Sequence, residues 1–301
     1  MTEPVEAVWS TVEAVGAQLA DVSALLLVAG LALHAMKLAA RARAWQNVLR
    51  ASMPERRVRF ADAAVPSLAG IGAGAVVPFG GGELLRVALV RARLRGRDGG
   101  EGGASTAMIL GSLTVERALD AAVSVVVVSI ALTVGLVPNR ALRGRAAGLV
   151  VLLAQPVFVC VAGGAIGLAG IGAWRYRRRL AVAGGAVLRG LRVLRQPRRY
   201  LTSVASWQLL AWALRYGALV VLLDAFHVPS AALVAPIVLS LQLLAGSVPL
   251  TPAGAGTQQA LIGAAFGSGA ILAFSVGAQA ATMLLDVFLG AAALAGYGIR
   301  P

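Results

Sequence analysis

Apolar residues fill most of the chain in long runs, and short basic segments separate the runs. Five long runs extend over residues 10–36, 106–137, 146–173, 201–223 and 270–294. Each run exceeds the roughly 20 residues that an α-helix needs to cross the hydrocarbon core of a bilayer. The pattern predicts an all-α, polytopic membrane protein with about five full spans.

Two other apolar stretches, residues 60–94 and 228–267, are each interrupted by proline and glycine. The interruptions consist of Pro78, Gly80, Gly81 and Gly82 in the first stretch and Pro249, Pro252, Gly254 and Gly256 in the second. Hydrocarbon offers no hydrogen-bond partner to the backbone groups that such a break frees, so a break within the membrane is tolerated where it lines a cavity. We therefore predict two re-entrant hairpins. A plain span is the alternative for the first stretch.

The composition agrees with a membrane protein. Hydrophobic residues make up 58% of the chain, charged residues make up 13%, and the mean hydropathy is +0.81, whereas an average soluble domain has about 25% charged residues. The net charge of +14 would also suit nucleic-acid binding, but the 27 basic residues lie mostly between the apolar runs. This distribution is typical of cytoplasmic loops. We expect a cell-membrane (inner-membrane) protein with no nucleic-acid partner.

The basic segments also predict a topology. Residues 41–59, 91–100 and 175–199 are rich in arginine and are therefore expected in the cytoplasm. The first 21 residues carry four carboxylates and no lysine or arginine, which places the N-terminus outside and gives no basic start of a signal peptide. Arg300 places the C-terminus in the cytoplasm. If the first interrupted stretch crossed the bilayer, the arginines after it would lie outside, so the charges favour a re-entrant hairpin.

We predict a single transmembrane domain, residues 1–301, built from two similar halves. Each half, residues 10–137 and 201–297, contains a span, an interrupted hairpin and a span with charged residues. The span 146–173 and the basic cytoplasmic segment 174–200 link them. Because the charges make the first hairpin enter from the cytoplasm and the second from outside, the halves are predicted to be inverted repeats. Paired interruptions in such repeats indicate the binding site of a transporter.

Ionisable side chains occur inside the predicted membrane elements, where each costs roughly 2.5–3.5 kcal/mol. Glu116, Arg117 and Asp120 lie within one apolar run, and the four-residue spacing puts Glu116 and Asp120 on one helix face. Glu83 and Arg86 follow the first break. Such groups are candidates for function, and we predict that Arg117 pairs with carboxylates across the hairpin. Salt bridges that only hold helices together are the alternative.

The helix starts after the two breaks are candidate anion sites, because free N–H groups and the positive end of the helix dipole suit a phosphate or carboxylate. The second start carries Gln258 and Gln259, and Arg215 lies within another span. We therefore add these three residues to the charged ones as candidate headgroup ligands.

The sequence contains few residues that are suited to disulfide formation, metal binding or catalysis. Cys160 is the single cysteine, and His34 and His227 are the two histidines, so we expect no intramolecular disulfide, no metal site and no cofactor. His34 is expected to be a packed or interfacial side chain. Serine, histidine and aspartate are not grouped, and no phosphate-binding loop motif is present, so we do not expect an enzyme.

Three sequence blocks resemble the signature of the lysylphosphatidylglycerol synthase transmembrane family, also called the flippase-like domain. They are residues 78–86, 115–120 and 249–259, and residues 43–49 are similar to the family's first cytoplasmic segment. In the founding members this domain moves aminoacylated phosphatidylglycerol between leaflets, and a separate soluble domain, which we do not expect here, makes that lipid.

The resemblance implies functional roles for the charged residues of the first two blocks, which are Glu83, Arg86, Glu116, Arg117 and Asp120. Two positions depart from the family pattern. Gln259 stands where the family often has glutamate, and an arginine often found in the last span has no clear counterpart near Met283.

Our leading hypothesis is a flippase-like protein that binds membrane lipids and translocates a phospholipid or another phosphate-bearing lipid between leaflets. Arg86, Arg117 and Arg215 would hold the phosphate, while the acidic residues balance these charges or engage an amine. One alternative is a non-transporting scaffold or regulatory subunit of a cell-envelope enzyme. Another is a membrane enzyme that acts on a lipid-linked substrate.

Overall fold

The computed structural model describes residues 20–77, 81–96, 106–133, 197–246, 254, 256–266 and 270–298. Secondary structure within these residues is helical, as predicted. The helices are α2 (Ala24–Ser52), α3 (Phe60–Val76), α4 (Gly81–Gly96), α5 (Thr106–Thr133), α8 (Pro197–Tyr200), the π-helical turn η3 (Leu201–Ala205), α9 (Ser206–Ala225), α10 (Ala231–Gly246), α11 (Thr257–Phe266) and α12 (Ala270–Gly298).

Several predicted features lie outside the described residues. They are the linking span 146–173, most of the basic segment 174–200, the start of the first run, and the break residues Pro78, Gly80, Pro249 and Pro252. The predictions for these residues are neither confirmed nor corrected by the structure.

Three helical segments are long and apolar enough to cross a membrane: α2, the continuous segment Pro197–Ala225, and α12 up to Gly296. Helix α5 is also long, with 28 residues, but its charged residues interrupt the apolar surface. Helices α3 and α10 are apolar and shorter, with 17 and 16 residues. The protein is therefore a multi-pass membrane protein with short apolar helices between its long ones, in agreement with the prediction.

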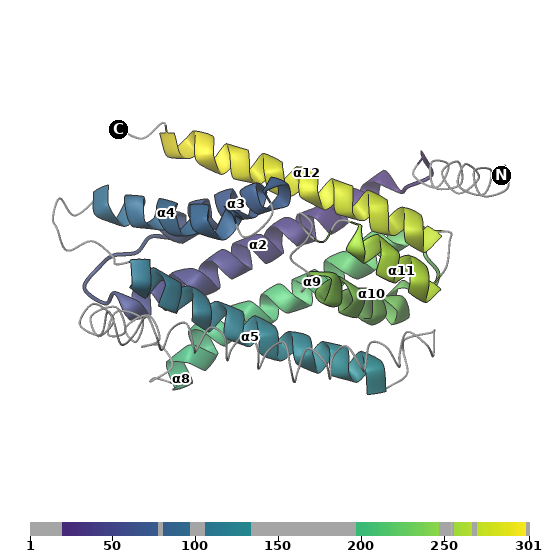
Figure 1. Ribbon diagram of the computed structural model, residues 1–301, viewed down its shortest axis with the longest axis horizontal. Coiled ribbons are helices and arrows are strands. Elements are labelled where there is room, and N and C mark those ends of the chain that lie inside the picture. Colours follow the sequence, from purple (N-terminus) through teal and green to yellow (C-terminus); the bar gives the residue numbers. More distant parts are fainter. Residues whose placement is uncertain are drawn as a thin grey trace, which may run out of the picture.

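Helices α2 and α9 form an antiparallel pair at the centre of the molecule (Figure 1). At one end, Ser23 N donates a hydrogen bond to Ala225 O (3.0 Å). At the other end, Asn47 Nδ2 donates to Ser203 O (2.5 Å). Gly30 allows the helices to approach closely, because a Cβ atom there would lie 2.6 Å from Leu222 Cγ. This pair is the axis on which the two hairpins are arranged.

The contacts of the two halves correspond to each other. Hairpin α3–α4 contacts α2 and α5 of its own half and α12 of the other half, and hairpin α10–α11 contacts α9 and α12 of its own half and α5 of the other. Figure 1 shows the hairpins at opposite ends of the α2 and α9 pair. Together with the antiparallel central pair, this correspondence agrees with the predicted inverted repeats.

The first hairpin packs against the middle of the long helix α12. Helix α3 begins at a local cap, in which Arg59 N donates to Asp62 Oδ2 (2.8 Å). Its other end packs against α4 without intervening side chains, since a Cβ atom on Gly82 would lie 2.1 Å from Gly70 O. Gly72 packs against the backbone of Asp286, which lies near the middle of the 29-residue helix α12. A re-entrant hairpin enters the membrane only part of the way, so contact with the middle of a long helix agrees with this prediction.

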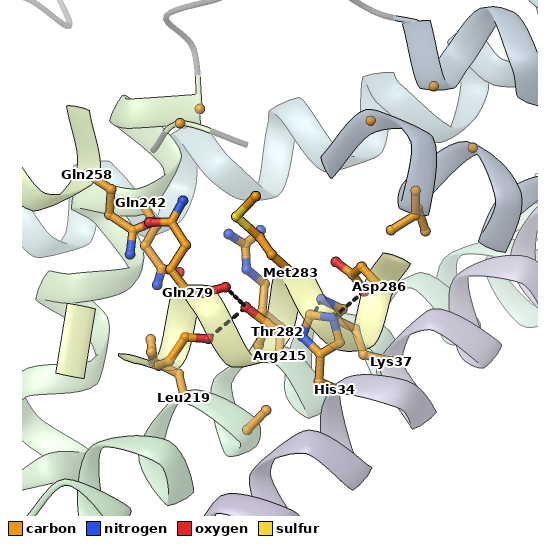
Figure 2. A pocket seen from close by; sticks show the side chains of 18 of the residues that line it. His34, Lys37, Arg215, Leu219, Gln242, Gln258, Gln279, Thr282, Met283 and Asp286 are labelled. Atoms are coloured by element: carbon orange, nitrogen blue, oxygen red, sulfur yellow. Dashed lines mark hydrogen bonds and ion pairs between the residues drawn. The ribbon is translucent and has the colours of Figure 1, made fainter. Parts of the chain in front are cut away.

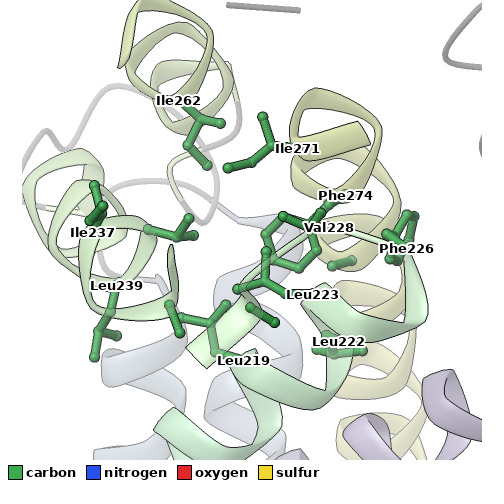
Figure 3. Packing of buried hydrophobic residues seen from close by; sticks show 14 of the residues in the cluster. Leu219, Leu222, Leu223, Phe226, Val228, Ile237, Leu239, Ile262, Ile271 and Phe274 are labelled. Carbon is green, nitrogen blue, oxygen red and sulfur yellow. The ribbon is translucent and has the colours of Figure 1, made fainter. Parts of the chain in front are cut away.

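The apolar core of the second half forms one wall of the site described below. It contains residues from α9 to α12, among them Leu223, Ile262 and Phe274 (Figure 3). Phe226 and Phe274 pack edge to face with ring centroids 5.7 Å apart. These side chains fix α12 against α9, so that polar residues on both helices face the space between the hairpins.

The predicted end of the first span was wrong. The helix does not end near Met36 but continues as α2 to Ser52, just before Pro54. Arg41, which we expected in a cytoplasmic segment, forms ion pairs with Glu116 and Asp120. The reason is that these two carboxylates need a cation inside the protein, and Arg41 lies at their level on the neighbouring helix. The orientation of the termini stays a prediction.

Candidate functional site

A cavity of about 860 Å³ lies between the two hairpins. Gly74 and Gly82 of the first hairpin line it, and so do Gly246 and Gly254 of the second. Its volume falls within the range of about 300–1,000 Å³ that is usual for sites of small ligands. The two Pro/Gly interruptions that were predicted to line a cavity therefore lie on the same one. Figure 2 shows the polar side chains that project into it.

The charges on the cavity wall are unbalanced. Among the described residues that line it, four carry a formal positive charge, namely Lys37, Arg86, Arg117 and Arg215, and two are carboxylates, Glu83 and Asp286. The surplus of positive charge favours an anionic ligand.

Charged residues connect the first hairpin to α5. Arg117 forms an ion pair with Glu83. Arg86 Nη2 donates to Glu116 Oε2 (2.7 Å), and Arg86 Nη1 lies 3.8 Å from Glu83 Oε2. We call these four residues the ionic clasp. The predicted pairing of Arg117 across the hairpin is confirmed, although its partner is Glu83 and not the acids on its own helix.

Glu116 and Asp120 are engaged by helices α2 and α9. Arg41 Nη2 donates to Glu116 Oε1 (3.0 Å) and to Asp120 Oδ2 (2.5 Å). Trp212 Nε1 donates to the other oxygen of Asp120 (3.2 Å). Neither acid is among the described residues that line the cavity, and the Glu116 side chain is only 2% exposed. Both acids therefore hold together the helices that form the wall. Glu116 also binds Arg86, whose guanidinium stacks 3.8 Å from the centre of the Trp45 ring.

Neutral amides connect the second hairpin to α12. Gln259 Oε1 accepts a hydrogen bond from Gly256 N (2.8 Å), and Gln259 Nε2 donates to Gln279 Oε1 (2.6 Å) and to Ser275 O (3.2 Å). We call Gln259 and Gln279 the amide clasp. Gly254 and Gly256 before it have φ values of +73° and +83°, which glycine adopts without the strain that a side chain causes. Gln259 is not among the cavity-lining residues, whereas Gln279 is.

Two further amides line the cavity and have no hydrogen-bond partner among the described residues. Gln242 of α10 and Gln258 of α11 line it, and neither has a hydrogen bond to another of the described residues. Gln258 is only 8% exposed. Its donors and acceptors are therefore available to a ligand or to water in the cavity.

A histidine and an acid form a third polar group on the wall. His34 Nε2 lies 3.0 Å from Asp286 Oδ1, and Lys37 Nζ lies 3.2 Å from His34 Nδ1 (Figure 2). Both ring nitrogens of His34 are thus engaged. His34 is a cavity residue with polar partners, and the expectation of a simply packed or interfacial side chain missed these partners.

Arg215 differs from the other cations of the cavity. Its guanidinium lies 5.3 Å from the centre of the Trp212 ring. Within the part of the chain that the structure describes, it forms no ion pair and no hydrogen bond. Ser67 Oγ, also on the cavity wall, is buried and lacks a hydrogen-bond partner among these residues.

The family model described as the lysylphosphatidylglycerol synthase TM region matches residues 6–290 of the chain. The protein belongs to this family. No curated protein and no solved structure shows significant similarity to it. The resemblance to this family is thereby confirmed. The described residues of two of the three blocks provide the ionic clasp, and those of the third include Gly254, Gly256 and Gln259.

Sequence analysis did not identify several site residues of this family member. Lys37, Gln242, Gln279 and Asp286 line the cavity but were not named as candidates. Arg41 was not named either, although it binds Glu116, which in turn binds the cavity residue Arg86. The sequence of α2 does contain a pattern that indicates some of these residues. His34, Lys37, Arg41 and Trp45 recur at spacings of three and four residues, so they share one face of a helix once that helix is continued to Ser52. In the described residues no group of three or more His, Cys, Asp or Glu side chains could hold a metal ion.

Proposed function

We propose that this protein is a flippase-like transporter, which binds the headgroup of a phosphate-bearing membrane lipid in the cavity and moves the lipid between leaflets. The observation that carries the proposal is that both interrupted hairpins line one cavity with a surplus of positive charge. Sites of this kind, at the interface of two repeats and between broken helices, are typical of secondary transporters.

Arg215 is the best candidate for the primary phosphate ligand. The other cations of the cavity already have partners: Arg86 and Arg117 bind the acids of the ionic clasp, and Lys37 contacts His34. A charged arginine inside a membrane protein is costly, by about 2.5–3.5 kcal/mol on insertion scales, unless water or a counter-ion reaches it. A lipid phosphate would supply that counter-ion through charge-assisted hydrogen bonds.

The pair between Glu83 and Arg117 supports movement of the ligand. The two side chains are 39% and 57% exposed, in contrast to the buried pair between Arg86 and Glu116. An exposed ion pair contributes only about 0–1 kcal/mol, so it can open at little cost. Arg117 can then transfer from Glu83 to a passing phosphate and back.

The hydrogen bonds of His34 also favour transport over catalysis. Ser67 is on the cavity wall and could suggest a nucleophile. Activation of a serine requires a base within hydrogen-bonding distance. Both nitrogens of His34 are engaged by Asp286 and Lys37, and Ser67 Oγ has no partner among the described residues. We therefore propose that the lipid leaves the cavity chemically unchanged.

The proposal is tested in proteoliposomes that contain a fluorescent phospholipid, by measuring how fast the label of the inner leaflet becomes accessible outside. The wild type should accelerate exchange over protein-free vesicles. Arg215→Gln should lose at least about tenfold of this acceleration, because an amide cannot replace the charge and fork geometry of arginine. Arg198→Gln, on the exposed surface of α8, is the matched control and should behave as the wild type. No acceleration by the wild type would favour the scaffold hypothesis instead.

A further inference from the structure

The second hairpin presents neutral amides to the cavity. Gln242, Gln258 and Gln279 come from three consecutive helices and line the same space. In Figure 2 they lie on one side of the cavity, and Asp286, His34 and Lys37 lie on the other. The cavity therefore has a neutral polar side and a charged side.

The neutral side has unused hydrogen-bonding capacity. A primary amide offers two N–H donors and a carbonyl acceptor with two lone pairs. Gln242 and Gln258 use none of this capacity on other described residues, and Gln258 is almost fully buried. Leaving a buried polar group unsatisfied is unfavourable, so these amides match a ligand that both donates and accepts hydrogen bonds. A hydroxyl group does both.

Among the described residues, both carboxylates of the cavity wall already have basic partners. Glu83 is bound by Arg117, and Arg86 lies 3.8 Å from Glu83, so that Glu83 keeps a neighbouring cation when Arg117 moves to a phosphate. Asp286 is bound by His34, which also contacts Lys37. A positively charged headgroup would thus meet a surplus of cations and only carboxylates that are already engaged.

We infer that the transported lipid is an anionic phosphodiester whose headgroup carries neutral hydroxyl groups and no amine. Arg215 binds the phosphate, and Gln242 and Gln258 bind the hydroxyls. This inference rests on the proposed function and adds the chemical class of the headgroup to it. Glycerol, a sugar or an inositol ring on the phosphate would all meet these requirements.

The test compares lipids that differ only in their hydroxyls. Binding of short-chain phosphatidylglycerol and short-chain phosphatidylpropanol to the full chain in detergent is measured by titration calorimetry. Both headgroups have one negative charge and three carbons, but the propyl group lacks the two free hydroxyls. We expect the wild type to bind the glycerol lipid at least about tenfold more tightly, since sites that bind a hydroxyl discriminate against analogues without it.

The double variant Gln242→Leu, Gln258→Leu should reduce this ratio to below about twofold, because its side chains keep their approximate size but lose their hydrogen bonds. Ser240→Ala is the matched control on α10. The Ser240 hydroxyl donates to Pro236 O of its own helix, and Ser240 is not among the described residues that line the cavity, so the ratio should be unchanged.

A single variant provides an independent test if the double variant does not fold. Gln258→Glu places an unpaired carboxylate at the same position, and it should raise the affinity for phosphatidylethanolamine, which carries an amine, at least about fivefold. Phosphatidylinositol is included to identify the polyol. Tighter binding of phosphatidylglycerol or phosphatidylinositol than of the propyl lipid supports the inference. The ratio of the affinities for these two polyol lipids shows whether the site prefers a glycerol or an inositol ring.

The inference would be overturned if the wild type bound neither the glycerol lipid nor phosphatidylinositol more tightly than the propyl lipid, or if it preferred phosphatidylethanolamine. If lipid exchange in vesicles is still accelerated in that case, the proposed function stands. If the wild type binds no phosphodiester and accelerates no exchange, both the proposed function and this inference are wrong.

Discussion

The two hairpins are attached to the last helix of their halves in chemically different ways. In the first half, Glu83 and Arg86 of α4 bind Arg117 and Glu116 of α5. In the second half, Gln259 of α11 binds Gln279 of α12. Both links are polar, but only the first is ionic. The first half therefore places charges where the second half has neutral amides.

Burial divides the ionic clasp further. Glu116 is buried between Arg86 and Arg41, whereas Glu83 and Arg117 are accessible from the cavity. Removing one partner of a buried ion pair leaves an uncompensated charge, while an exposed pair contributes little to stability. We assign stability to the buried part of the clasp and lipid movement to its accessible part. The following changes test this division, from the largest expected effect to the smallest.

Glu116→Gln should have the largest effect on stability. It leaves the buried guanidinium of Arg86 and the partly buried one of Arg41 without their shared carboxylate, and we expect a loss of about 3–5 kcal/mol in the free energy of unfolding. Denaturant unfolding in detergent, followed by tryptophan fluorescence, measures this loss. An effect below about 1 kcal/mol, the size expected for an exposed pair, would mean that the clasp is not buried.

Gly82→Ala should destabilise the first hairpin. The new methyl group would lie 2.1 Å from Gly70 O and 2.8 Å from Gly74 N, so α3 and α4 would have to separate. We expect a loss of about 1–3 kcal/mol or more. Gly246→Ala, at the end of α10 in the second hairpin, is the matched control, because no neighbouring atom of the described residues lies within 4 Å of the added atom. Equal melting temperatures of the two variants would contradict the close packing of α3 on α4.

Glu83→Gln should separate function from stability. The pair with Arg117 is exposed, so the free energy of unfolding should change by about 1 kcal/mol or less. Lipid movement should nevertheless be abolished, because Arg117 no longer exchanges between a carboxylate and a phosphate. Both quantities are measured on the same preparation, at matched protein amounts in the vesicles. Normal lipid movement in this variant would show that the accessible pair has no role in transport.

Gln259→Leu should lower stability less than Glu116→Gln does. It removes the hydrogen bonds to Gln279, Ser275 O and Gly256 N, and each neutral hydrogen bond contributes about 0.5–1.5 kcal/mol. The comparison of its unfolding curve with that of Glu116→Gln measures the difference between the two clasps directly. A loss as large as that of Glu116→Gln would mean that the amide clasp is no weaker than the ionic one.

The sequence predicts the hairpins well because their signals are local. Proline and glycine end an apolar helix wherever the chain folds. The predicted limits 228–267 enclose α10–α11, and the limits 60–94 contain α3–α4 except for the last two residues of α4, which ends at Gly96. The pairing of Arg117 with Glu83 is also predictable, since both charges lie inside the membrane and need a partner.

The rest of the site depends on contacts that are distant in the sequence. Arg41 is 75 residues from Glu116, and a rule based on the charge of loops assigns it to the cytoplasm. Gln242 and Gln279 are neutral, so they hardly change the hydropathy of the helices that contain them. Only the packing of α10, α11 and α12 shows that their amides face the same space as Arg215.

The most direct test of a headgroup in the cavity is photo-crosslinking from two positions of α12. A photoreactive amino acid replaces either Met283, which lines the cavity, or Phe288, which is 68% exposed on the outside of the same helix. The probe is phosphatidylglycerol with a radiolabel in the glycerol headgroup, supplied in membranes that contain the full chain. We predict that Met283 captures the labelled headgroup, that Arg215→Gln removes this capture, and that capture at Phe288 does not depend on Arg215. Equal capture at Met283 with and without Arg215, or capture at Phe288 alone, would contradict the binding of the phosphate in the cavity.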